Sequence, residues 1–237
     1  MTDSSSPENS SAKSPAPALP SASVILVRDN NDTLEVLLVQ RNANIKFHGG
    51  AWVFPGGKVD EADRHGTDDG SEIGLARVAA IREVQEEAGV SLDVSALRDF
   101  SHWLTPIQQP KRFSTWFFIA PLAADTTIQV DASEIVDHIW LTPEEALARQ
   151  ATKELTFPPP TFVSLTKLQG LSSVKALDTF TESLGVEKFA PKIVENEQGR
   201  VALYAGDAGF DAVELEAPGA RHRLNMLKSG WYYEQRL

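Results

Sequence analysis

The spacing of apolar residues predicts strands and one helix in the first part of the chain. Three apolar runs are typical of strands, and a polar turn at residues 30–32 joins the first two into a predicted hairpin. The runs cover residues 23–28, 34–41 and 51–57. Apolar residues then recur at three- and four-residue steps over residues 72–88, which predicts a helix that stops at Gly89.

The second half of the chain mixes strand and helix patterns. Residues 112–122 and 134–141 are rich in aromatic and β-branched residues, which predicts two strands. Thr142, Pro143 and Glu145 form the N-cap, first turn and capping box of a helix. A second helix is predicted at about residues 162–184, with short strands after it. Because no regular strand-helix-strand rhythm appears, we predict a mixed α/β (α+β) fold with a mixed sheet.

The two ends of the chain differ in composition from its centre. Residues 1–21 are rich in Ser, Pro and Ala and have few large apolar side chains, so we expect a disordered tail. Residues 22–237 are then one domain, with a core at about 22–157 and a C-terminal extension at about 158–237.

Composition excludes several classes of function. The net charge of −11 argues against a surface that coats nucleic acid, since phosphates are held by Lys and Arg. The chain has no cysteine, which excludes disulfides and zinc-thiolate sites. No apolar run of about 18 residues is present, so no membrane span is expected and a cytoplasmic location is predicted.

The predicted helix carries an unusual group of acids near its end. Glu83, Glu86 and Glu87 stand at positions i, i+3 and i+4, so their carboxylates share one helix face. Carboxylates are the ligands that Mg²⁺ and Mn²⁺ prefer. Arg82 lies four residues before Glu86 and is placed to brace it. The alternative is an ordinary solvated helix face.

The surrounding residues decide between these readings, because together they resemble the Nudix box. The matching positions are Gly57, Arg82, Glu83, Val84, Glu86, Glu87, Gly89 and Val90, with F-P-G-G in front. The resemblance implies a mixed sheet between helices and a hydrolase that splits the diphosphate of a nucleoside diphosphate derivative with Mg²⁺ or Mn²⁺. It also implies metal binding by Glu83, Glu86 and Glu87, and catalysis by Glu86 and Glu83 with Arg82.

The box departs from the family pattern in one place. The spacing from the glycine assigns a further acid to Asp63, yet Asp63 lies nineteen residues before Arg82 where the family has eight. An insertion of about eleven residues therefore separates the loop from the helix, and Glu61 and Glu72 are alternatives for this acid. Such an insertion is similar to one in the peroxisomal coenzyme A diphosphatase branch.

Further segments carry the same resemblance and suggest substrate contacts. Residues 110–118 and 158–162 are similar to segments of that branch, and residues 37–57 resemble a coenzyme A signature in which Lys46 replaces an arginine. The substrate residues expected from this are Arg41, Lys46, Gly57, Arg112 and Phe113, and Glu134 is a candidate additional acid.

The predicted partner is a small nucleoside diphosphate derivative, with coenzyme A or acyl-coenzyme A favoured. ADP-ribose, NADH and other nucleotides remain alternative substrates. A non-catalytic nucleotide-binding module is the alternative from another class, although three metal-ready carboxylates disfavour it. The sequence leaves the oligomeric state open.

Overall fold

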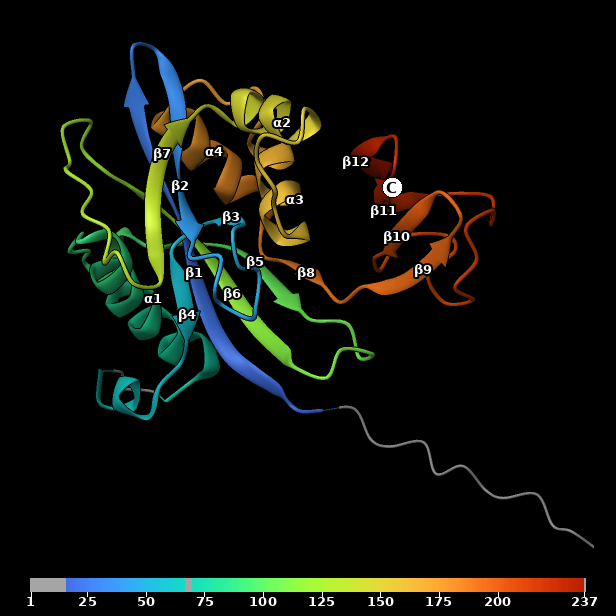
Figure 1. Ribbon diagram of the computed structural model, residues 1–237, viewed down its shortest axis with the longest axis horizontal. Coiled ribbons are helices and arrows are strands. Elements are labelled where there is room, and N and C mark those ends of the chain that lie inside the picture. The colour runs from blue at the N-terminus through green and yellow to red at the C-terminus, as the bar shows by residue number, and fades with distance from the viewer. Residues whose placement is uncertain (1–15, 67–69, 237) are drawn as a thin grey trace, which may run out of the picture.

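The computed structural model describes residues 16–66 and 70–236. Within them the chain forms an eight-stranded sheet, a separate four-stranded sheet, and helices on both faces of the larger sheet (Figure 1). The predicted mixed α/β fold is therefore confirmed. No helix in these two ranges is both long and apolar enough to cross a membrane.

The first hairpin of the sheet agrees with the prediction. It joins β1 (Ala18–Asn30) to β2 (Thr33–Arg41) through Asn31 and Asp32. Both turn residues have positive φ, 47° and 64°, as hairpin turns that follow the strand twist require. β1 begins at Ala18, four residues before the predicted start of order, because Ala18 already pairs with β6. The rest of the predicted tail, residues 1–15, lies outside the described residues.

The larger sheet is mixed in strand direction. Its main order is β3-β2-β1-β6-β5-β8, while β4 pairs with β1 and β7 pairs with β2. β1 runs antiparallel to β2 and parallel to β6, which are neighbours on its two sides. The remaining strands are β3 (Trp52–Val53), β4 (Gly56–Lys58), β5 (Arg98–Leu104), β6 (Arg112–Pro121), β7 (Ile135–Leu141) and β8 (Glu187–Phe189).

Helix α1 (Glu72–Ala88) has the bounds that the sequence predicts. Ser71 caps its first turn by accepting a hydrogen bond from the N–H of Gly74. Gly89 ends it in the left-handed region at φ 69°, which glycine adopts without the steric cost of a Cβ. The apolar stripe of α1, with Ala80 and Val84 at its centre, packs against one face of the sheet.

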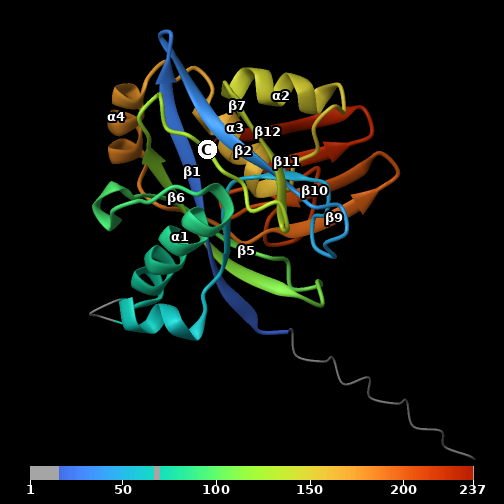
Figure 2. The same ribbon diagram turned by 60° about the vertical axis from the view of Figure 1, so that its left-hand side comes forward.

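The opposite face of the sheet is covered by α2 (Pro143–Ala151), α3 (Pro159–Leu168) and α4 (Val174–Leu184). Figure 2 shows α1 on one side of the sheet and α2 and α3 on the other, as the predicted sandwich requires. The predicted capping box of α2 is present, with Thr142 and Glu145 each bonded to the other's backbone N–H.

The prediction of a single helix over residues 162–184 is wrong. The chain leaves α3 at Gln169 and turns at Gly170, whose φ of 80° is unsuited to a right-handed helix. Ser173 then caps a new helix, α4, through the N–H of Ala176. The apolar spacing continues across the break, which is why the sequence pattern did not reveal it.

A second sheet is formed by the last part of the chain, in the order β12-β11-β10-β9. Its strands are β9 (Lys192–Asn196), β10 (Gly199–Leu203), β11 (Arg221–Leu227) and β12 (Gly230–Arg236). The sheet shares a hydrophobic core with the larger one: the rings of Trp103 and Phe189 stack 4.0 Å apart, and Tyr204 packs against both. The predicted division of the domain at about residue 158 stays a prediction.

Candidate active site

A cavity of about 1120 Å³ lies between α1, the larger sheet and the second sheet. Side chains of α1 and the loop before β4 line one end, and residues of β9, β10 and β11 line the other. Among the predicted site residues, the lining contains Arg41, Lys46, Gly57, Arg82, Glu83, Glu86, Glu87, Phe113 and Glu134. Predicted site residues as far apart in sequence as Arg41 and Glu134 therefore meet in one cavity.

The three glutamates of α1 differ in their surroundings. Glu87 is only 5% exposed and accepts a hydrogen bond of 2.8 Å from the N–H of Gly56. Burial raises its pKa to about 8, although that N–H opposes the shift. Burial also raises the pKa of Glu83, while Glu86 is 58% exposed. The helix thus turns two poorly solvated acids and one solvated acid toward the cavity.

The two glycines at the start of β4, Gly56 and Gly57, lie in direct contact with these acids. A Cβ added at Gly57 would overlap the carboxylate of Glu83, and one at Gly56 would overlap the backbone of Ala22. Only glycine allows β4 to approach α1 at Gly57 and β1 at Gly56 so closely. The predicted importance of Gly57 thus has a steric basis, whatever contact it makes with substrate.

Arg82 holds the acidic face together. Its guanidinium donates to Glu83 at 2.9 Å and to Glu86 at 3.2 Å, which confirms the predicted bracing of Glu86. It also forms a two-point ion pair with Asp63, at 2.9 and 3.0 Å. Arg82 therefore links the 3₁₀ turn η1 (Glu61–Gly66), which carries Asp63, to the acidic end of α1.

Asp63 itself is buried beneath Arg82 and does not line the cavity. Burial by itself would raise its pKa, but hydrogen bonds from Arg82 and from the N–H of Asp60 outweigh burial and leave the pKa below its usual value. Glu61 is exposed and pairs with Arg64, and Glu72 lies at the other end of α1 near Trp116. Of the three acids considered from the sequence, Asp63 is thus the one that contacts Arg82.

The acidic face has the carboxylate ligands that a divalent cation prefers, but their side chains are not arranged around a common point. Among residues 16–66 and 70–236, no three acidic or histidine side chains are arranged to hold a metal ion. The guanidinium of Arg82 is bonded to oxygens of Glu83 and Glu86, the two acids that a metal ion would share with Glu87. Burial raises the pKa of Glu83 and of Glu87, and a divalent ion beside them would favour their charged forms. The metal-binding roles stay predictions.

Positive and aromatic side chains line the cavity beside the acids. Arg41 lies 3.9 Å from Glu134, and its Nε is buried without a hydrogen-bond partner. Phe113 contacts Phe47 with ring centroids 5.0 Å apart, and the ammonium of Lys111 lies 5.2 Å from the Phe113 ring. This end of the cavity can therefore contact an anion and a flat ring at the same time.

The structure does not bring Arg112 to the cavity. Side chains alternate along β6, so that Phe113, Thr115 and Phe117 line the cavity while Arg112 points to the other face. Its guanidinium donates instead to the carbonyls of Thr105 and Ala16. Arg112 therefore does not line this cavity, and its predicted contact with substrate stays a prediction.

Several lining residues were not identified from the sequence. Phe47, His48 and Lys111 lie close in sequence to predicted positions, and only their neighbourhood could have indicated them. Burial and the adjacent Arg41 lower the pKa of His48. Arg200 and the other lining residues of the second sheet had no sequence signal, because their place depends on how the two sheets pack.

Comparison with known proteins places this arrangement in context. The family model described as the NUDIX domain matches residues 17–162. The chain is 27% identical to the acyl-coenzyme A diphosphatase NUDT19 of Homo sapiens over 266 residues, covering 73% of this chain and 71% of that protein. It is 25% identical to the protein of that name from Xenopus laevis over 274 residues, covering 76% and 72%.

A solved structure agrees with the fold. The crystal structure of a NUDIX hydrolase from Alicyclobacillus acidocaldarius superposes with a TM-score of 0.63 at 22% identity, covering 71% of this chain and 97% of that one. The likeness concerns the fold alone, and it covers 71% of this chain.

Proposed function

The chain belongs to the NUDIX domain family and is a Nudix pyrophosphohydrolase; from this premise we propose that it cleaves coenzyme A or acyl-coenzyme A with the help of Mg²⁺ or Mn²⁺. The reaction would break the diphosphate and release 4′-phosphopantetheine, or its acyl derivative, and adenosine 3′,5′-bisphosphate. One water molecule is consumed, and the two products are phosphate monoesters.

The acidic face of α1 at the end of a large cavity is the observation that carries this proposal. Glu83 and Glu87 are acids with raised pKa values beside a glycine loop, and Glu86 is open to solvent. A divalent ion bound there would neutralise the diphosphate and polarise the phosphorus that water attacks. In this proposal Glu83, Glu86 and Glu87 hold the metal.

Side chains of the protein would accept the proton of the attacking water and orient the carboxylates. Glu83 or Glu86 accepts the proton of the attacking water, since both lie on the cavity side of α1. Arg82 orients these two carboxylates, and Asp63 orients Arg82 in turn. Water attacks one phosphorus as the bond to the bridging oxygen breaks, so the bridging oxygen leaves on the other phosphate.

The charged and aromatic lining supports the assignment of the substrate's nucleotide part. Arg41 and Lys46 line the same cavity as the acidic face, and we assign the phosphates to these two basic side chains. Phe47 and Phe113 offer ring faces to an adenine. Glu134 beside Arg41 would limit how strongly that arginine binds an anion in the absence of metal.

Two observations favour a coenzyme A type of substrate over a smaller nucleotide. Pockets for small ligands usually measure about 300–1000 Å³, and the cavity of about 1120 Å³ exceeds that range. The relatives reported above are named acyl-coenzyme A diphosphatases.

The cytoplasmic location of the protein stays a prediction.

A turnover assay on a panel of substrates tests the proposal. We would incubate the protein with coenzyme A, octanoyl-coenzyme A, ADP-ribose and NADH, each with Mg²⁺, with Mn²⁺ and with a chelator, and separate the products by chromatography. The expected result is metal-dependent release of adenosine 3′,5′-bisphosphate from the coenzyme A substrates. Preference for ADP-ribose or NADH would replace the substrate assignment, and no turnover at all would favour a binding module.

A matched pair of variants tests the metal site. Glu86→Gln should lower turnover by about 100-fold or more, because the loss of one carboxylate weakens both metal binding and proton transfer. Glu72→Gln makes the same change on the same helix, but away from the cavity, and should retain turnover. Calorimetry with Mn²⁺ should show weaker binding only for Glu86→Gln, and equal binding by both variants would contradict the assignment.

A further inference from the structure

The second sheet forms the far wall of the cavity. None of the residues of this wall was among the site residues predicted from the sequence. Its lining residues are Ile193, Glu195, Arg200, Ala202, Tyr204 and Met226. We propose that this wall binds the part of the substrate beyond the diphosphate, as a site for an uncharged, mainly apolar chain. The proposal rests on the proposed function and adds to it the residues that decide which substrate is accepted.

Strand register shows that the wall is one continuous face. Arg200 and Ala202 alternate along β10, so their side chains share a side of the sheet, and Tyr204 directly follows the last residue of the strand. Ile193 of β9 is the direct partner of Ala202, and Met226 of β11 is the direct partner of Arg200. Directly paired residues project to the same face, so three neighbouring strands contribute to a single surface.

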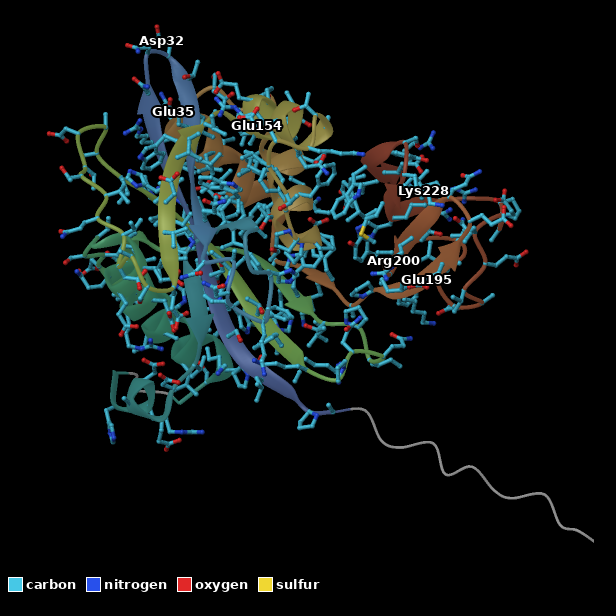
Figure 3. All side chains as sticks on the ribbon, viewed as in Figure 1. Asp32, Glu35, Glu154, Glu195, Arg200 and Lys228 are labelled. Carbon is cyan, nitrogen blue, oxygen red and sulfur yellow. The ribbon has the colours of Figure 1, made fainter. Side chains whose placement is uncertain are left out.

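The chemistry of this face differs from that of the glutamate end. Its only charged members within the described lining are Arg200 and Glu195, which form an ion pair of 3.0 Å at exposed positions. Figure 3 shows these two labelled side chains close together on the second sheet. The two charges balance each other at the rim of the wall. The inner part of the wall is apolar, with Ile193 and Met226 half-buried and Ala202 buried between them.

The facing side of the cavity is also apolar. Pro158, Pro159 and Pro160 at the start of α3 line it, as do Trp103 and Phe117 of the larger sheet. A proline run has little backbone freedom to lose on binding, so this side is rigid. An uncharged chain between the prolines and the second sheet would remove apolar surface of both from water.

The space for such a chain continues beyond the main cavity. A second cavity of about 550 Å³ shares His48, Pro158, Pro159, Arg200 and Met226 with the first, and extends to Trp231 of β12. The two cavities therefore adjoin along Met226 and the start of α3. A chain that enters from the diphosphate side has room to extend toward Trp231.

Tyr204 closes the inner end of the wall. It is fully buried, and its ring packs against the rings of Trp103 and Phe189. The surroundings of this end are therefore apolar, which suits an uncharged chain.

Two neighbouring residues of β9 give a matched test. Ile193 faces the cavity, whereas Val194 is half-buried on the opposite face and pairs with Val201. We would measure kcat/KM for octanoyl-coenzyme A and for ADP-ribose in the wild type, Ile193→Asp and Val194→Asp. We expect Ile193→Asp to lower the ratio of kcat/KM for octanoyl-coenzyme A to kcat/KM for ADP-ribose by about tenfold or more. The reason is that the bound octanoyl chain would remove water from the new carboxylate, which is unfavourable. Val194→Asp should keep the wild-type ratio.

Independent measurements keep the test decisive. Thermal unfolding checks that each variant is folded, and Ile193→Trp, which fills the space without adding charge, replaces Ile193→Asp if the latter is unfolded. An unchanged ratio in both Ile193 variants, or an equal fall in Val194→Asp, would overturn the proposed wall.

Binding separates this proposal from the proposed hydrolysis. Calorimetry with octanoyl-coenzyme A in the absence of metal should show binding to the wild type that weakens about tenfold or more in Ile193→Asp and not in Val194→Asp. If this holds while no substrate is turned over, the hydrolytic function is wrong and the wall is retained. If turnover is seen but binding does not respond to Ile193→Asp, the wall is wrong and the function is retained.

Discussion

The Asp63–Arg82 pair allows a sharp prediction, because it lies beneath the site without lining the cavity. Asp63→Asn keeps the size of the side chain and removes its charge. Asp63 is 3% exposed, and Arg82 is 25% exposed with further partners in Glu83 and Glu86. We expect the variant to fold with lower stability and with a weaker response to metal.

The structure sets the size of the stability change. Removing one partner of a buried ion pair costs about 3–5 kcal/mol, while a hydrogen bond to a charged group contributes about 1.5–3 kcal/mol. Asparagine still accepts a hydrogen bond from the N–H of Asp60, and Arg82 keeps its other partners. We therefore expect the free energy of unfolding to fall by about 2–3 kcal/mol at pH 7. Because the pKa of Asp63 is lowered in the folded protein, this difference should shrink as the pH falls below about 4.

Urea denaturation and a Mn²⁺ titration of turnover would measure both effects. Without its anchor, Arg82 is freer to pair with Glu83 and Glu86, so more metal should be needed for half-maximal turnover. Glu61→Gln is the control, because it removes an acid of the same 3₁₀ turn that is 86% exposed. If Asp63→Asn behaves like Glu61→Gln in both assays, the positioning role of Asp63 is refuted.

Three further predictions concern the loop, the cavity and the second sheet. Gly57→Ala should lower turnover by about tenfold or more with the fold retained, since a displacement of catalytic groups by about 1 Å costs that much; circular dichroism and the turnover assay check this, and wild-type kinetics would contradict the contact with Glu83. Arg41→Ala should raise KM for coenzyme A by about 10- to 100-fold with a smaller effect on kcat, which steady-state kinetics would measure. Asp207→Asn should lower the free energy of unfolding by about 3–5 kcal/mol at pH 7, because it leaves Arg223 buried without its charged partner. Burial alone would raise the pKa of Asp207, but Arg223 and backbone N–H groups lower it to about 2, so the carboxylate stabilises the fold above about pH 4 and this contribution is lost as the pH falls toward 2. Urea titrations at pH 7 and pH 3 should show the difference between variant and wild type shrinking, and a constant difference would refute it.

The amino-acid sequence by itself determined the features that depend on residues close together in the chain. The face shared by Glu83, Glu86 and Glu87 follows from helical periodicity, and the stop at Gly89 from its left-handed conformation. The capping box before α2 and the first hairpin are equally local. In each case the hydrogen bonds that decide the structure join residues within a few positions of one another, so the pattern carries the information.

Tertiary structure decided everything that depends on residues far apart in the chain. Ala18 belongs to a strand because it pairs with Arg112, and Asp63 matters because folding brings it to Arg82 across an insertion. The alternation along β6 turns Arg112 away from the cavity, and the wall around Ile193 exists only because the second sheet packs against the first. Such pairings are selected by the burial of the whole core, in which many chain segments compete for the same partners. A local sequence pattern does not show which of these competing pairings forms. The acidic face of α1 could therefore be predicted from the sequence, whereas the wall formed by the second sheet could not.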